Sequence, residues 1–181
     1  VGYGYRPTIH LPKLPAAGTY SLVVSPGFAT MASQVSVAAD PVTPLDGPVT
    51  NVAMGSPSQT TRTLFDATAG QAIGVGIGAY TQNASTTSAA NFNVYQPNGT
   101  QLGGSGSFNA YWAWSSNPAG NWDGEFVAPA TGRYEMIAQP VAGYAASYGA
   151  SISSAVTGTL LPDVPLDFTL SRIGQDGRFM F

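Results

Sequence analysis

The sequence has no cysteine, one histidine and one lysine, and only 8% of its 181 residues are charged. The absence of cysteine excludes disulfides, thiol catalysis and cysteine-based zinc sites. A net charge of -3, from 9 acidic and 6 basic residues, offers none of the clustered Lys and Arg that nucleic acid or an anionic membrane requires. No run approaches the roughly 18–20 uninterrupted apolar residues of a transmembrane helix, so we expect no membrane span.

Glycine and proline are abundant, with 22 and 14 residues, while 44% of the chain is hydrophobic and 11% aromatic. That apolar content is sufficient to form a core and is atypical of a disordered chain. So much Gly and Pro favours short strands joined by turns over helices. The low charge and the richness in Ser, Thr and Asn predict a secreted protein, extracellular or at the cell surface. The sequence begins at Val1 without a methionine, so we expect a processed or excised piece.

The periodic signals have period two, which is typical of half-buried strands. Residues 73–78 alternate aliphatic side chains with glycine, so one face of that strand is bare backbone. We expect a bulky ring or a neighbouring backbone against that face. The predicted fold is all-β, an antiparallel β-sandwich of the jelly-roll or Ig-like kind. Other expected strands include residues 20–24, 34–37, 92–95, 134–137, 168–170 and 178–181. The expected core includes Ile73, Val75, Ile77, Phe92, Val94, Tyr134 and Met136.

An internal repeat organises the chain. Residues 15–26 align with residues 129–140 through shared Pro, Gly, Tyr and Pro, and residues 59–65 align with residues 175–181 through Gln, Arg and Phe. The sequence therefore predicts sandwich modules in tandem. The predicted divisions are a closing half over residues 1–44, a complete module over residues 45–157 and the opening strands of a further module over residues 158–181.

The corner within the first repeated stretch has a physical explanation. Pro129 ends one strand, Gly132 supplies a positive φ, and Tyr134 opens the next strand with its ring inward. Its hydroxyl is expected to bind a backbone group of the corner, as tyrosine corners do in other sandwiches. We expect Tyr20 to do the same in the other module.

Residues 63–71, 93–100 and 126–134 read TLFDATAGQ, NVYQPNGT and FVAPATGRY, in that order. This succession resembles bacterial pre-peptidase C-terminal-like (PPC-like) β-sandwich modules, and it is still more similar to the tandem modules of large secreted proteins with Rhs-type repeats. The resemblance implies a secreted, non-catalytic sandwich used for adhesion, spacing or assembly. Some such modules bind calcium through clustered aspartates near the first strand. Here Asp66 stands alone, so we expect no calcium site and no cofactor.

Residues that suggest catalysis are isolated. His10 has no nucleophile elbow or triad pattern near it in the sequence. The glycines of residues 74–78 lie within a strand and precede no helix, unlike a dinucleotide-binding loop. Asp123 and Glu125 could form a carboxylate pair, but a solvated strand edge accounts for them better. Asp163 and Asp167 fit a linker between modules. We therefore expect no enzyme.

Two groups of residues remain as candidate sites. The first is an aromatic cluster on a Gly-rich stretch, which can cap the core, form a protein interface or stack on sugars: Tyr111, Trp112, Trp114 and Trp122. The second is a set of strand-completion residues at both ends of the chain, which read head to tail as one alternating strand: Phe168, Leu170, Phe179, Phe181, Val1, Tyr3 and Tyr5.

The leading hypothesis is a non-catalytic structural repeat unit of a bacterial surface filament, fibre or matrix protein. Its partners are copies of itself or adjacent modules, joined by strand complementation or by tandem continuation. The alternative is a carbohydrate- or surface-binding accessory module of a secreted enzyme, with a polysaccharide as its partner.

Overall fold

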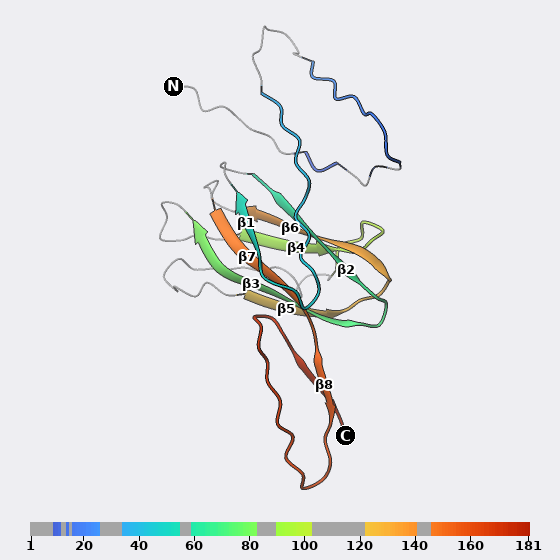
Figure 1. Ribbon diagram of the computed structural model, residues 1–181, viewed down its shortest axis with the longest axis vertical. Coiled ribbons are helices and arrows are strands. Elements are labelled where there is room, and N and C mark those ends of the chain that lie inside the picture. The colour runs from blue at the N-terminus through green and yellow to red at the C-terminus, as the bar shows by residue number, and fades with distance from the viewer. Residues whose placement is uncertain are drawn as a thin grey trace. The chain divides into compact units, whose positions relative to one another are not determined.

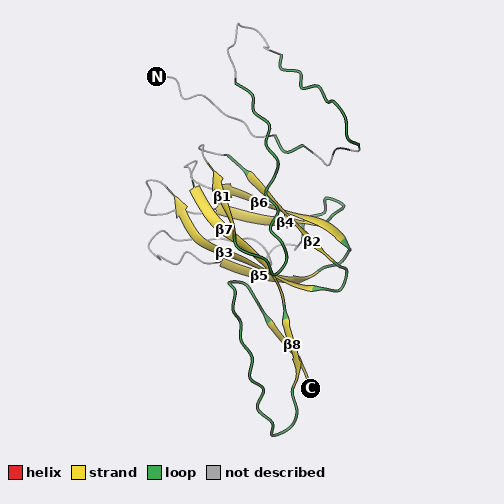
Figure 2. Ribbon diagram, viewed as in Figure 1, coloured by secondary structure: helices red, strands yellow, loops and turns green. Residues whose placement is uncertain are grey.

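The computed structural model describes residues 9–11, 14, 16–25, 34–54, 59–82, 90–102, 122–140 and 146–181. Over these residues the protein contains strands, turns and irregular segments, with no helix, so the predicted all-β class is confirmed (Figures 1 and 2). The described part accordingly holds no helix that could cross a membrane. The chain divides into two compact units: residues 9–39, called here the N-terminal segment, and a larger unit that includes residues 40–181.

Two antiparallel sheets form a sandwich in the larger unit (Figure 1). The four-stranded sheet has the order β1 (Thr50–Met54), β7 (Ala146–Ser154), β3 (Ala72–Gln82), β5 (Trp122–Val127). The three-stranded sheet has the order β2 (Thr61–Ala67), β6 (Gly132–Pro140), β4 (Ala90–Tyr95). Strands that are distant in sequence are therefore direct neighbours, and most of the core depends on non-local pairing.

The core lies between these sheets because apolar side chains alternate along the strands. The seven core residues that the sequence predicts are each no more than 1% exposed, which confirms them. At one end of the core, the ring of Phe65 stacks on that of Tyr134 with centroids 5.5 Å apart. At the other, Phe92 meets Tyr148 edge to face at 5.1 Å. Aromatic pairs in these geometries add to the stabilisation that burial gives.

The predicted turns are present. The amide of Gly99, at φ 84°, donates to the carbonyl of Gln96. At the corner between β5 and β6, Gly132 has φ 150°. The fully buried Tyr134 donates its hydroxyl proton to the carbonyl of Ala130 at 2.6 Å. The tyrosine-corner prediction is confirmed here.

Beyond β7 the chain forms a second, smaller sheet. β8 (Val156–Thr159) pairs in parallel with β9 (Gly177–Met180). The sequence pattern predicts β9 but not its parallel partner. A parallel pair requires a long connection, and residues 160–176 supply it. Residues 156–181 are called here the C-terminal segment.

Three predicted strands are absent from the described residues. Residues 20–24, 34–37 and 168–170 carry the alternating pattern, yet the structure gives them no strand pairing. A segment with an alternating pattern forms a strand only when a neighbouring strand supplies the backbone hydrogen bonds. In these three stretches the apolar side chains remain exposed.

Candidate strand-completion site

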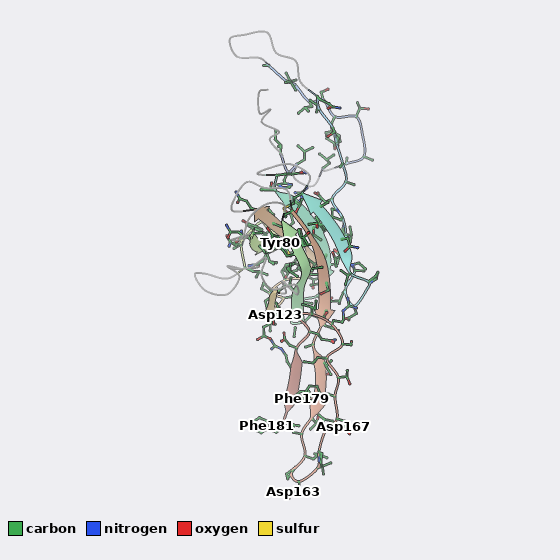
Figure 3. The ribbon with its side chains drawn as sticks, turned by 90° about the vertical axis from the view of Figure 1, so that its left-hand side faces the viewer. Tyr80, Asp123, Asp163, Asp167, Phe179 and Phe181 are labelled. Carbon is green, nitrogen blue, oxygen red and sulfur yellow. The ribbon has the colours of Figure 1, made fainter. Side chains whose placement is uncertain are left out.

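The C-terminal segment has an open apolar surface. The exposed fractions of Phe168, Leu170 and Phe181 are 52%, 45% and 104%. Figure 3 labels Phe179 and Phe181 on this segment, with Asp163 at its turn. The rings of Phe168 and Phe179 pack against each other with centroids 4.7 Å apart and form a small cluster on the segment.

A glycine allows that cluster to lie over β8. A Cβ at Gly158 would be 2.9 Å from Cδ2 of Leu166 and 3.1 Å from Cδ1 of Phe179. A larger residue here would require both side chains to shift, so the glycine lets them lie close to the backbone of β8. The cluster thus covers one face of the small sheet.

The segment is attached to the sandwich at the bare face of β3. Cβ atoms on Gly74 and Gly76 would overlap the carbonyls of Gly174 and Ile173. The hydroxyl of Ser151 donates to the carbonyl of Ile173 at 2.9 Å. The expectation that a neighbouring backbone covers the glycine face is therefore confirmed. This contact of residues 171–176 with β3 and β7 is called here the joint.

Arg172 fastens the joint from the other side. Its guanidinium donates to the hydroxyl of Ser153 at 3.0 Å, to the carbonyl of Asp46 at 3.0 Å and to the carbonyl of Gly47. The Asp46 carboxylate in turn accepts hydrogen bonds from the amide and hydroxyl of Ser154, at 2.9 and 2.6 Å. One planar cation thus links the turn at residues 46–47 to the end of β7, a geometry that the fork of arginine suits.

Charged side chains meet where the segment passes β5. Arg178 forms an ion pair with Glu125 at 3.1 Å. Burial raises the pKa of Asp176, and a hydrogen bond with Glu125 and the negative charges of Glu125 and Asp123 raise it further, against the opposing effect of Arg178. Glu125 therefore contributes an ion pair to the attachment of the segment, whereas Asp123 adds only a negative charge near Asp176. No three His, Asp or Glu side chains gather as a metal site among the described residues.

The backbone hydrogen bonds of β8 and β9 resemble those between residues 42–43, where the chain enters the sandwich, and β2. The amide of Thr43 donates to the carbonyl of Leu64 at 2.8 Å, next to a parallel bridge between Val42 and Leu64. The amide of Leu160 donates to the carbonyl of Met180 at 2.7 Å, next to the parallel pair of Thr159 and Met180. The turn that follows each entry holds an aspartate at positive φ.

Those aspartates are Asp46, at φ 55°, and Asp163, at φ 59°. A positive φ is uncommon outside glycine, and aspartate is one of the residues that tolerate it. Residues 156–181 therefore resemble residues 40–65 in hydrogen bonding and backbone conformation as well as in sequence.

The N-terminal segment contains the counterpart of the closing corner. The hydroxyl of Tyr20 donates to the carbonyl of Ala16 at 2.6 Å, as that of Tyr134 does to Ala130. The prediction that Tyr20 forms a second tyrosine corner is confirmed. Tyr20 is 49% exposed, however, whereas Tyr134 is fully buried. The corner forms locally, but no second sheet covers its ring in the described part of the chain.

Some of the predicted site residues are outside the described part. Tyr111, Trp112 and Trp114 lie outside it, and Trp122 is placed only as the first residue of β5. Val1, Tyr3 and Tyr5 also lie outside it. Their predicted roles stay predictions.

Sequence reasoning missed the roles of Arg172 and Gly174 in the joint. A signal was present, since alternating glycines imply a close backbone partner, and Gly174 directly precedes the aligned stretch 175–181. The glycine pattern did not identify that partner, because Gly74 and Gly174 are a hundred residues apart in the sequence.

Neither a protein-family model nor a curated protein matches the chain. Several solved structures are similar to it, of which three are described here. A periplasmic inhibitor of g-type lysozyme (PliG) from Aeromonas hydrophila is 23% identical with a TM-score of 0.35, over 63% of this chain and 99% of the other. The pre-peptidase C-terminal domain of a Bacillus anthracis collagenase is 10% identical with a TM-score of 0.36, over 65% and 99%. PliG from Salmonella Typhimurium is 14% identical with a TM-score of 0.35, over 63% and 99%.

The second of these structures belongs to the class whose motifs the sequence resembles. At these identities and TM-scores the likenesses assign no function. Membership of that class, and the Rhs-type context, stay predictions. The fold defines the protein as an antiparallel β-sandwich with a small parallel sheet, β8–β9, attached to it.

Proposed function

We propose that the protein is a non-catalytic structural repeat unit of an extracellular filament, fibre or matrix, and that its units join through their terminal segments. The observation that carries this proposal is the repeated entry geometry: residues 156–181 form the hydrogen bonds and turn with which residues 40–65 open the sandwich. A segment that opens a module and exposes its apolar side chains requires a closing half. The Tyr20 corner supports residues 9–39 as that half.

The two segments carry sequences whose counterparts in the complete sandwich are neighbouring strands. Residues 18–24 correspond to β6, which pairs with β2, and residues 177–181 correspond to β2. If the two alignments are continued at the same offsets, residues 34–39 correspond to the end of β7 and residues 166–170 correspond to β1, the strand that pairs with β7. Neither segment supplies a counterpart of β3 or β4. The contact therefore comprises one pair of strands in each sheet, and we expect it to be reversible rather than permanent.

Strand complementation between copies and tandem continuation in a longer chain use the same pairing. The low charge and the low lysine content support an extracellular or cell-surface location. The isolated candidates for catalysis support a non-catalytic role.

The test is the association of the full chain, followed by sedimentation velocity over a wide concentration range and by electron microscopy. We expect assemblies that grow with concentration. Phe181→Asp places a charge on the open apolar surface and should abolish them. Val127→Asp adds the same charge at a half-exposed position of β5, outside the C-terminal segment, and should leave association intact. A chain that stays monomeric at all concentrations, or equal effects of both changes, would contradict assembly between copies. A monomer that is retained on an insoluble polysaccharide would favour the accessory-module alternative.

A further inference from the structure

The open edge of β9 has a defined counterpart in this chain. We propose that it pairs antiparallel with residues 18–24 of a second copy, in the register that places Phe181 opposite Tyr20 and Met180 opposite Ser21. This inference rests on the proposed function, and it names the partner segment and the alignment of the two strands.

The register follows from two equivalences and one observed pairing. The aligned sequences place Phe181 at the position of Phe65 and Tyr20 at the position of Tyr134. In the sandwich, Phe65 is the Cα partner of Tyr134, and Leu64 is the partner of Glu135. Transferring those pairs gives Phe181 with Tyr20 and Met180 with Ser21. A slip of one residue would turn every inward side chain outward, so the apolar pattern specifies the register strongly.

The side chains on the two faces agree with this alignment. On β6 the inward positions are Tyr134, Met136 and Ala138, all fully buried. Their counterparts Tyr20, Leu22 and Val24 are also apolar, yet they are 49%, 60% and 47% exposed. Pairing with β9 would place these three side chains on the same face as Phe179 and Phe181, and would cover both sets.

An aromatic stack is expected at the end of the pair. Phe65 and Tyr134 stack with their planes 18° apart. Phe181 and Tyr20 occupy the same two positions, and the Tyr20 hydroxyl is already fixed on the backbone of its own corner. The ring that Phe181 would meet is therefore held in place before the strands pair.

The repeat also indicates that the partner is a second copy. Residues 42–43, which follow the N-terminal segment, bridge in parallel to β2 in the way that residues 156–159 pair in parallel with β9. The N-terminal segment thus precedes the sandwich by one repeat, and the C-terminal segment follows it by one repeat. The two segments of one chain therefore contact two different neighbouring units. The C-terminal segment of one copy and the N-terminal segment of the next copy meet at one junction.

The experiment is disulfide trapping between two full-length variants, one carrying M180C and the other S21C. The chain has no cysteine of its own, so each variant holds a single thiol. Both positions are exposed, and neither lies on the inward face of its strand. Isotopic labelling of one variant identifies cross-links between the two variants by mass spectrometry. Circular dichroism of each variant verifies that its fold is retained.

The matched control replaces S21C with V23C. Val23 is on the same face two residues further along and is 81% exposed. Directly opposite residues in an antiparallel pair have Cα atoms about 4.5–5.5 Å apart, within reach of a disulfide, whereas a diagonal position lies at about 7–8 Å. We expect severalfold more cross-linking of M180C with S21C than of M180C with V23C.

Each outcome decides one point. Association with preferential M180C–S21C cross-linking supports the register. Association with equal or reversed cross-linking overturns the register and leaves assembly through the terminal segments standing. The absence of association overturns both the register and assembly between copies.

Discussion

Phe65, near the end of β2, and Tyr134, near the start of β6, stack with ring centroids 5.5 Å apart. Both residues are fully buried, and the two strands align them as direct Cα partners. The hydroxyl of Tyr134 also holds the corner that leads from β5 into β6. One residue thus closes the core and fixes the chain reversal beside it.

Removing the hydroxyl of this tyrosine separates the two roles. Tyr134→Phe keeps the stack but leaves the amide and carbonyl of Ala130 without the hydroxyl that binds them. We expect a loss of about 1–2 kcal/mol in the free energy of unfolding. Tyr20→Phe makes the same change at an exposed corner outside the sandwich and should cost less than about 0.5 kcal/mol. Urea denaturation measures both, and equal losses would mean that the two corners contribute alike.

A methyl group on the bare face of β3 should open the joint. Gly74→Ala places a Cβ on the Gly174 carbonyl, so residues 171–176 must move away at a cost of about 1–3 kcal/mol. Hydrogen exchange should rise at the amide of Gln175, which binds the carbonyl of Arg172. Gly18→Ala is the control, because nothing lies within 4 Å of the added atom. Unchanged exchange in the Gly74 variant would show that the joint does not depend on this contact.

Arg172 should resist conservative replacement. Lysine keeps the charge but cannot bind Ser153, Asp46 and Gly47 with one planar group. We expect Arg172→Lys to weaken the joint by about 1–3 kcal/mol, measured by exchange or by limited proteolysis after β7. Arg133→Lys tests the same exchange at the exposed ion pair with Asp66, where the expected loss is only about 0–1 kcal/mol. Similar losses in the two variants would contradict a special role for the Arg172 fork.

The sequence predicts the sandwich well because its core uses local alternation. Ile73, Val75 and Ile77 alternate with glycine, and each is buried as expected. The Gly132–Tyr134 corner is equally predictable, since Gly supplies the required φ and the hydroxyl reaches a carbonyl four residues away. These features depend on neighbours in the sequence, and a pattern of residues can therefore reveal them.

The attachment of the C-terminal segment could not be predicted in the same way. The contact between Gly74 and Gly174 and the hydrogen bonds of Arg172 to the turn at Asp46 join positions far apart in the chain. The parallel pairing of β8 with β9 also depends on the path of residues 160–176. At residues 20–24 the alternation is present without a strand, because no neighbour among the described residues provides the ladder.

The Trp112 and Trp114 rings provide a further test of how the units associate. Changing both to Ala removes two large rings from a Gly-rich stretch. If the rings form a contact between units, association in sedimentation experiments should weaken while circular dichroism remains unchanged. Loss of folding would assign the rings to the core. Retained association with lost binding to polysaccharide would favour the accessory-module alternative.

The stability of the joint should depend on pH through Asp176. Burial and the nearby Glu125 and Asp123 carboxylates raise its pKa above the ordinary value of 3.8, whereas Arg178 opposes the shift. The docked segment therefore holds the Asp176 proton more tightly than the free segment does. As pH rises from the ordinary value through the raised one, that proton is lost and docking weakens, and at higher pH the loss is constant. Hydrogen exchange at residues 171–180, measured on both sides of this range, should become faster with increasing pH beyond the intrinsic rate. Asp176→Asn should remove the dependence and strengthen docking at neutral pH.

Asp66→Asn is the control of opposite sign, because the hydrogen bond from Arg133 lowers the pKa of Asp66. Its contribution is present above 3.8, is lost as pH falls through the lowered value, and affects unfolding of the sandwich only slightly since the pair is exposed. Docking that strengthens as pH rises through the Asp176 range would contradict this account of the joint.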